Sequence, residues 1–198
     1  MKNLNTPNRL TLARVLLVPV FVACYCISFP CHYLVSLAVF VIASITDAVD
    51  GKLARSRNEI TDFGKFLDPL ADKVLVISAM ACFLQDRRMN IAAFLLIITR
   101  EFMVSALRLV VANKGTVVPA SFAGKLKTAF TMIAIITALV WWSYQFDFHA
   151  IGLEWLLETS YTPVDIAIDI LFWIAAVLTV WSGVEYLKAY WKDINPNQ

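Results

Sequence analysis

Six apolar stretches follow one another along the chain, and short polar or charged segments separate them. Each stretch has about the 20 residues that an α-helix needs to cross the hydrocarbon core of a bilayer. None shows the strict alternation of polar and apolar positions that is typical of strands in a membrane barrel. The pattern therefore predicts helices, which satisfy their own backbone hydrogen bonds in lipid. The predicted spans are residues 10–29, 33–54, 66–84, 91–112, 122–144 and 165–190.

The composition also indicates a membrane protein. Of the 198 residues, 60% are hydrophobic and 16% are charged, whereas a soluble domain is about 45–50% apolar and about a quarter charged. We therefore expect an all-α fold, a polytopic bundle of six transmembrane helices preceded by a short N-terminal juxtamembrane segment. Six spans leave little room for a second domain, so we expect one integral membrane domain over residues 1–198. The formal net charge of +2 is too small to indicate a partner.

The distribution of Lys and Arg predicts the orientation. Outside the spans, these residues gather before the first span, between the second and third, between the fourth and fifth, and after the sixth. Among these loop residues, only Arg87 and Arg88 depart from the pattern. The segment 145–165 has four acidic residues and no Lys or Arg. Because cytoplasmic loops are enriched in Lys and Arg, we expect both termini and the connection between the second and third spans to lie in the cytoplasm.

That connection, "TDAVDGKLARSRNEITDFGKFLDPLADK" (residues 46–73), holds the densest group of charges. Asp47 and Asp50 are three residues apart, and Asp68 and Asp72 are four apart, so each pair lies on one face of its helix. The short connection makes the two helices antiparallel neighbours, and their acidic faces can meet. Four facing carboxylates are costly unless cations neutralise them. Oxygen ligands favour Mg²⁺, Mn²⁺ or Ca²⁺, and a pair of such ions promotes displacement at phosphorus.

Small residues and one arginine accompany these carboxylates. Gly51 and Gly64 share the acidic faces and allow a ligand to approach the backbone. Ala54 is also small, and Arg55 offers a planar set of donors suited to phosphate. The alternative is that these are solvated charges at a membrane edge. The regular spacing favours a binding site for a metal and a phosphate group.

The full pattern D-x2-D-G-x2-A-R-x8-G-x3-D-x3-D resembles the signature of the CDP-alcohol phosphatidyltransferases. Members transfer a phosphatidyl or related group from a CDP-linked donor to an alcohol, with release of CMP. The resemblance implies two bound Mg²⁺ or Mn²⁺ ions, a catalytic base at Asp72, and a homodimer of six-helix bundles whose sites open to the cytoplasm. The implied metal ligands are Asp47, Asp50, Asp68 and Asp72, and the implied donor-binding residues are Gly51, Ala54, Arg55, Thr61 and Gly64.

Further cations lie within the apolar stretches and suggest an anionic acceptor. Arg100 and Arg108 are eight residues apart and share one helix face. An arginine inside a span requires an anionic partner, which is either Glu101 or the phosphate of a substrate. The residues predicted to bind an acceptor phosphate are Arg14, Arg100, Arg108, Lys125 and Lys127.

Three segments, "PNRLTLAR", "TREFMVSALR" and "GKLKT", resemble bacterial members of the family that use sn-glycerol 3-phosphate as the acceptor. The resemblance implies CDP-diacylglycerol as the donor, phosphatidylglycerol phosphate as the product, and a location in the bacterial inner membrane. Expected partners are the two substrates, membrane lipids and a second copy of the chain, and no nucleic acid.

Two alternatives remain. One keeps the chemistry and changes the acceptor to inositol phosphate, serine or phosphatidylglycerol. The other is a cation or proton transporter, which requires carboxylates near the middle of the bilayer and a related second half of the chain.

Overall fold

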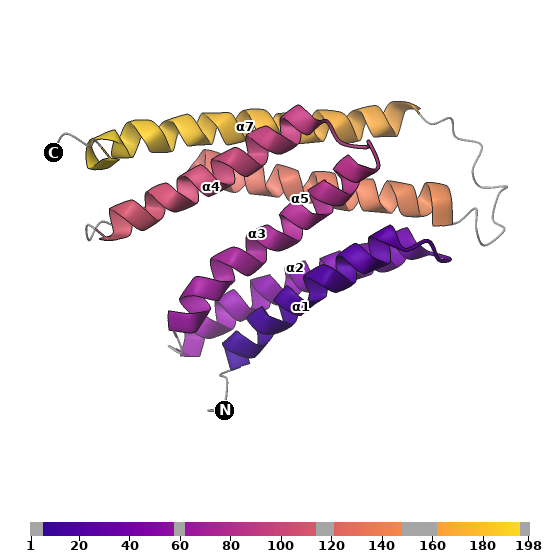
Figure 1. Cartoon of the computed structure of the whole chain (residues 1–198), viewed down its shortest axis with the longest axis horizontal. Helices are drawn as coiled ribbons and strands as arrows, with labels where there is room; N and C mark the ends of the chain where they lie inside the picture. Colours follow the sequence, from indigo (N-terminus) through magenta and orange to yellow (C-terminus); the bar gives the residue numbers. More distant parts are fainter. Residues whose placement is uncertain (1–5, 58–61, 114–120, 148–161, 195–198) are drawn as a thin grey trace. The chain divides into compact units, whose positions relative to one another are not determined.

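The computed structural model describes residues 6–57, 62–113, 121–147 and 162–194 (Figure 1). Every regular element within these residues is helical, and they contain no strand, which confirms the predicted all-α class. The elements are α1 (Thr6–Cys26), α2 (His32–Arg57), α3 (Asp62–Gln85), α4 (Ile91–Asn113), α5 (Phe122–Trp142), the π-helical turn η1 (Ser143–Asp147) and α7 (Thr162–Ile194).

Helices α4 and α5 each begin just after a residue whose side chain supplies a cap. The side chain of Asn90 accepts a hydrogen bond from the backbone N–H of Ala92 at 2.8 Å, at the start of α4. Ser121 does the same before α5, because its Oγ accepts from the N–H of Gly124 at 3.1 Å. Such side chains satisfy amide groups that the first turn of a helix leaves without a partner. The predicted spans overlap the observed helices, and the differences are confined to their ends.

The chain forms two compact units, and α5 contributes to both. The first unit comprises residues 1–85 and 135–160, and the second comprises residues 86–134 and 161–198. The expectation of a single membrane domain over the whole chain stays a prediction.

In the first unit, α1 packs against α2 and α3, and η1 packs against α2. Phe83 and Trp142 meet edge to face in its aromatic core, with 4.7 Å between their ring centroids. Asp147, which is buried, accepts a hydrogen bond from the N–H of Leu34 at 2.7 Å. This carboxylate caps the start of α2 from a segment more than a hundred residues away in sequence, so it holds η1 and α2 together.

In the second unit, α4 packs against α7. Val104, Leu107, Val111 and Tyr186 form a buried cluster between these helices. Several polar side chains are buried in the same unit: Arg100, Lys127, Thr131, Thr179 and Ser182. Because buried polar groups need partners, these side chains are expected to contact one another or other polar groups of this unit.

Within the part of the chain that the structure describes, two segments are long and apolar enough to cross a membrane, Phe122–Asp147 and Pro163–Trp191. The same part holds three shorter apolar segments, Thr11–Cys26, His32–Thr46 and Lys73–Gln85. Large apolar side chains are exposed on several helices, for example Val177 (62%) and Leu16 (60%). A surface of this kind is unfavourable in water and suits contact with lipid. These features support a membrane protein with helical spans.

Candidate functional site

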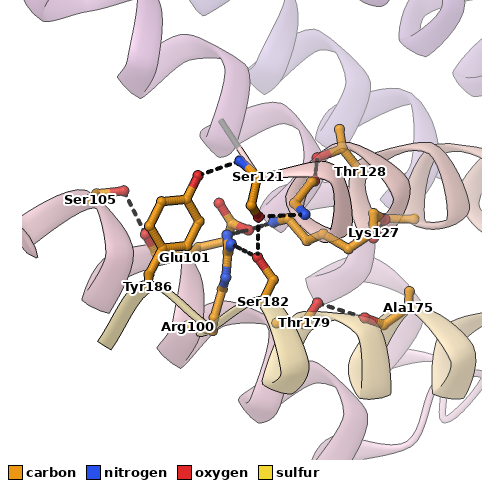
Figure 2. Close-up of polar contacts among 12 residues, drawn as sticks. Arg100, Glu101, Ser105, Ser121, Lys127, Thr128, Ala175, Thr179, Ser182 and Tyr186 are labelled. Carbon is orange, nitrogen blue, oxygen red and sulfur yellow. Dashed lines mark hydrogen bonds and ion pairs between the residues drawn. The ribbon is translucent and has the colours of Figure 1, made fainter. Parts of the chain in front are cut away.

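A group of charged and hydroxyl side chains lies where α4, the start of α5 and α7 meet (Figure 2). Its members on α4 are spaced for one helix face, and so are its two members on α7, which are four residues apart. We call this group the cation cluster. It consists of Arg100, Glu101, Arg108, Ser121, Lys127, Ser182 and Tyr186.

Tyr186 is the centre of the cation cluster. Its hydroxyl oxygen accepts hydrogen bonds from Nη2 of Arg108 at 2.7 Å and from the backbone N–H of Ser121 at 2.8 Å. Its ring lies 5.5 Å from the guanidinium carbon of Arg100 and 5.2 Å from that of Arg108. Both distances are within the range of attraction between a cation and an aromatic ring. One buried side chain therefore positions both arginines and the start of α5.

Arg100 is held on two sides. Its Nη2 donates a hydrogen bond to Oγ of Ser182, and its Nη1 lies 3.4 Å from Oε1 of Glu101. Ser182 Oγ is also 3.3 Å from Oγ of Ser121. The Nε atom of Arg100 is buried and has no acceptor within the described part of the chain. The guanidinium therefore keeps one donor that an additional ligand oxygen could satisfy.

Lys127 and Glu101 form an ion pair between α5 and α4. The Lys127 side chain is 8% exposed and that of Glu101 is 17% exposed, so the pair is largely removed from solvent. Among the residues that the structure describes, three cations of this cluster, Arg100, Arg108 and Lys127, meet one carboxylate. The cluster consequently has excess positive charge and is suited to an anion with more than one negative charge.

Glycine at position 183 makes room for the arginine. A Cβ atom added there would lie 3.1 Å from Cγ of Arg100 and 3.2 Å from Cε of Met103. A larger residue there would require the side chains of Arg100 and Met103 to shift by a few tenths of an ångström. The close approach that glycine allows keeps the guanidinium next to Ser182.

The cluster contains three of the five residues predicted to bind an acceptor phosphate, Arg100, Arg108 and Lys127. Lys125 is exposed, and its side chain forms no ion pair with the cluster in the described residues. It lies two residues before Lys127, and two residues rotate the side chain about 200° around a helix. Arg14 is buried in the first unit.

The aspartates predicted to bind metal all have helical backbone: Asp47 and Asp50 in α2, and Asp68 and Asp72 in α3. The two helices are in contact within the first unit, as the short connection predicts. The side chains of residues 47–69 and of residue 72 lie outside the described part of the structure, and so does all of Thr61. The described side chains contain no other group of three His, Cys, Asp or Glu residues that could hold a metal. Four carboxylates form a donor set that fits a hard divalent cation, and this site stays a prediction.

Sequence reasoning missed Ser182 and the role of Tyr186. The available signal was a serine and a tyrosine four residues apart on a largely apolar helix, since such a pair faces one neighbour. Glu101 was correctly considered as the partner of an arginine, and the structure shows that it also pairs with Lys127.

Residues 4–181 match the sequence model of the CDP-alcohol phosphatidyltransferases. The chain belongs to this family. Curated relatives with the name CDP-diacylglycerol–glycerol-3-phosphate 3-phosphatidyltransferase are similar over nearly their full length. The Bacillus subtilis (strain 168) protein is 38% identical over 96% of this chain and 97% of its own. The Salmonella typhimurium protein is 40% identical over 96% of this chain and 97% of its own. The Rickettsia bellii protein is 38% identical over 93% of this chain and 94% of its own.

The substitution Tyr186→Phe tests the central position of this hydroxyl. It keeps the ring and removes the acceptor for Arg108 and Ser121, so the free energy of unfolding should fall by about 1–3 kcal/mol. Thermal unfolding of the purified protein in detergent measures this effect. Tyr190→Phe is the matched control, because the Tyr190 ring stacks on Tyr186. Equal stability losses in the two variants would contradict the assignment.

Proposed function

We propose that this protein transfers the phosphatidyl group of CDP-diacylglycerol to the hydroxyl of sn-glycerol 3-phosphate. The products are phosphatidylglycerol phosphate and CMP, in phospholipid biosynthesis. The relatives that match nearly the whole chain carry the name of this activity. The structural observation that carries the proposal is the cation cluster, in which Arg100 and Lys127 are buried and Arg108 is exposed, and whose excess positive charge suits an acceptor with a phosphate dianion.

The donor would bind at the end of α2 and the start of α3. Asp47, Asp50, Asp68 and Asp72 would hold two Mg²⁺ or Mn²⁺ ions. When bound, such ions neutralise the pyrophosphate and stabilise the departing CMP. The CDP moiety would contact the residues of the family signature and a nearby threonine: Gly51, Ala54, Arg55, Thr61 and Gly64.

Asp72 would act as the base. A carboxylate within hydrogen-bond reach of the acceptor hydroxyl removes its proton as the oxygen attacks phosphorus. The attack forms the bond between the hydroxyl oxygen and the phosphatidyl phosphorus, and the bond to CMP breaks. The proton then passes from the carboxyl group to solvent.

The phosphate of the acceptor would bind to Arg100, Arg108 and Lys127. Arginine guanidinium groups bind phosphate through paired hydrogen bonds, and lysine adds a point charge. Tyr186 and Ser182 hold the two arginines in place before the acceptor arrives. Lys125 and Arg14 stay weaker candidates, because neither belongs to the cluster.

We further propose that the protein crosses the bacterial inner membrane six times. Both termini and the site would face the cytoplasm, where glycerol 3-phosphate is water-borne, and the functional unit would be a homodimer. The distribution of Lys and Arg supports this orientation.

A panel of acceptors tests the proposed reaction. Purified protein receives CDP-diacylglycerol, Mg²⁺ and one acceptor, either glycerol 3-phosphate, inositol phosphate, serine or phosphatidylglycerol, and CMP release is measured. Release with glycerol 3-phosphate alone is the expected result. Release with another acceptor, without release with glycerol 3-phosphate, would overturn the assignment.

Asp72→Asn should lower kcat at least 100-fold, which is within the range of general-base contributions, while donor binding is partly retained. Single-turnover CMP release and binding of CDP-diacylglycerol measure the two effects. Asp62→Asn is the control, since this residue belongs to neither acidic face. Normal turnover of Asp72→Asn would exclude the proposed base.

Arg108→Ala should raise the KM for glycerol 3-phosphate about 10- to 100-fold, because a charge-assisted hydrogen bond to phosphate is lost. The KM for CDP-diacylglycerol should change less than about twofold. A twofold change is small, since a loss of about 1.4 kcal/mol in binding free energy would change it tenfold. Arg87→Asn serves as the control, because Arg87 is exposed and asparagine tolerates its positive φ of 57°. If both substrates are affected equally, Arg108 is structural.

A further inference from the structure

The carboxylate of Glu101 occupies the place between the two most buried cations of the cluster. Its Oε1 atom contacts both Nζ of Lys127 and Nη1 of Arg100. Figure 2 shows the Glu101 side chain beside both groups. Glu101 is the most exposed of the three side chains, at 17% against 9% for Arg100 and 8% for Lys127. It is therefore the member of the trio with most room to move.

The donors that Glu101 uses are those that a bound phosphate requires. Two cations buried side by side without an anion are strongly unfavourable, and Glu101 supplies that anion when the site is empty. It does so incompletely, since Nε of Arg100 has no acceptor in the described residues. A phosphate monoester has three terminal oxygens where a carboxylate has two, so it can take the place of Glu101 at Lys127 and Arg100 and offer a further oxygen to the cluster.

The proposed reaction makes such a competing anion useful. The acceptor's own phosphate takes no part in bond making and remains on the product. Cations that bind the acceptor through this phosphate therefore bind the product equally well. Such uniform binding lowers KM without raising kcat, and it retards product release.

We propose that Glu101 is a resident competing anion of the acceptor site. It neutralises Lys127 and Arg100 in the empty enzyme, and it is displaced from them by the incoming phosphate. It returns to them when the phosphorylated product leaves. This inference rests on the proposed function, because it assigns the cation cluster to the acceptor phosphate.

The substitution Glu101→Gln tests this role, since it removes the charge and preserves the shape. In the absence of donor, inorganic phosphate should stabilise the variant against thermal unfolding more strongly than it stabilises the unaltered protein. The Kd for phosphate should fall about tenfold. This is the lower end of the change in affinity that one hydrogen bond to a charged group produces. The unliganded variant should unfold at a lower temperature, because Lys127 then loses its ion pair with Glu101. Glu185→Gln is the matched control, because this glutamate is exposed on α7.

The charge of the ligand provides a second readout that a general loss of stability does not produce. At about pH 8, methyl phosphate is a dianion, because the second pKa of a phosphate monoester is about 6. Dimethyl phosphate is a monoanion. Removal of one negative charge from the cluster should strengthen binding of the dianion more than that of the monoanion. An unchanged or weaker affinity for both ligands would overturn the proposal and leave Glu101 as a structural partner of Lys127.

The kinetic expectation is a lower KM for glycerol 3-phosphate in Glu101→Gln, with a kcat that does not rise. A raised or unchanged KM would contradict the proposal. If Glu101→Gln does not fold, Lys127→Met is compared with the double variant Glu101→Gln/Lys127→Met. The buried lysine is absent from both. Glu101 still contacts Arg100 in the single variant, so the double variant must bind phosphate more tightly, and equal or weaker binding overturns the proposal.

The phosphate measurements separate this inference from the proposed function. They need neither donor nor turnover, so they remain informative if the acceptor panel selects another alcohol. If the panel selects glycerol 3-phosphate and Glu101→Gln weakens phosphate binding, only the inference about Glu101 fails.

Discussion

Positive charge inside an apolar helical unit must be given partners, and the second unit is arranged around that requirement. Arg100 and Lys127 are buried, where an unpaired cation is costly. The ring of Tyr186 lies next to Arg100, and its hydroxyl accepts a hydrogen bond from Arg108. The carboxylate of Glu101 forms an ion pair with Lys127. These cations and their partners supply polar contacts between α4, α7 and the start of α5, beside the apolar cluster of α4 and α7. The cations and their partners together form a cluster of three cations and one carboxylate, whose excess positive charge suits an anion.

Much of this arrangement was predictable from the sequence. The length of the apolar stretches predicted the helices to within a few residues, because a helix in lipid cannot end where its backbone groups would be exposed. The eight-residue spacing of Arg100 and Arg108 predicted a shared face, and both guanidinium groups lie at one ring. The spacing of the four aspartates also predicts a metal site, since carboxylates that share a helix face beside an apolar run are costly unless cations neutralise them, and this site stays a prediction.

Other parts could not be predicted, because they depend on contacts between residues distant in sequence. Asp147 caps the start of α2 across more than a hundred residues. Ser182 meets Arg100 only because α7 packs against α4. The distinction between Lys125 and Lys127 required the rotation of α5 to be known, since both look alike as lysines near the start of a helix. The spacing of residues in the sequence shows which side chains share a helix face. The packing of the helices determines which residues that face contacts.

Binding strength and turnover oppose each other in this proposed reaction. A cluster of three cations strong enough to capture glycerol 3-phosphate retains a product with the same phosphate. Differential stabilisation of the transition state has to come from the donor side, where charge changes at the pyrophosphate and at the attacking oxygen. The acceptor cluster contributes position, and its affinity must stay moderate. A carboxylate within reach of both Lys127 and Arg100 lowers that affinity without removing a cation, and it keeps the empty site stable. Glu101 thereby connects the stability of the second unit to the release of its product.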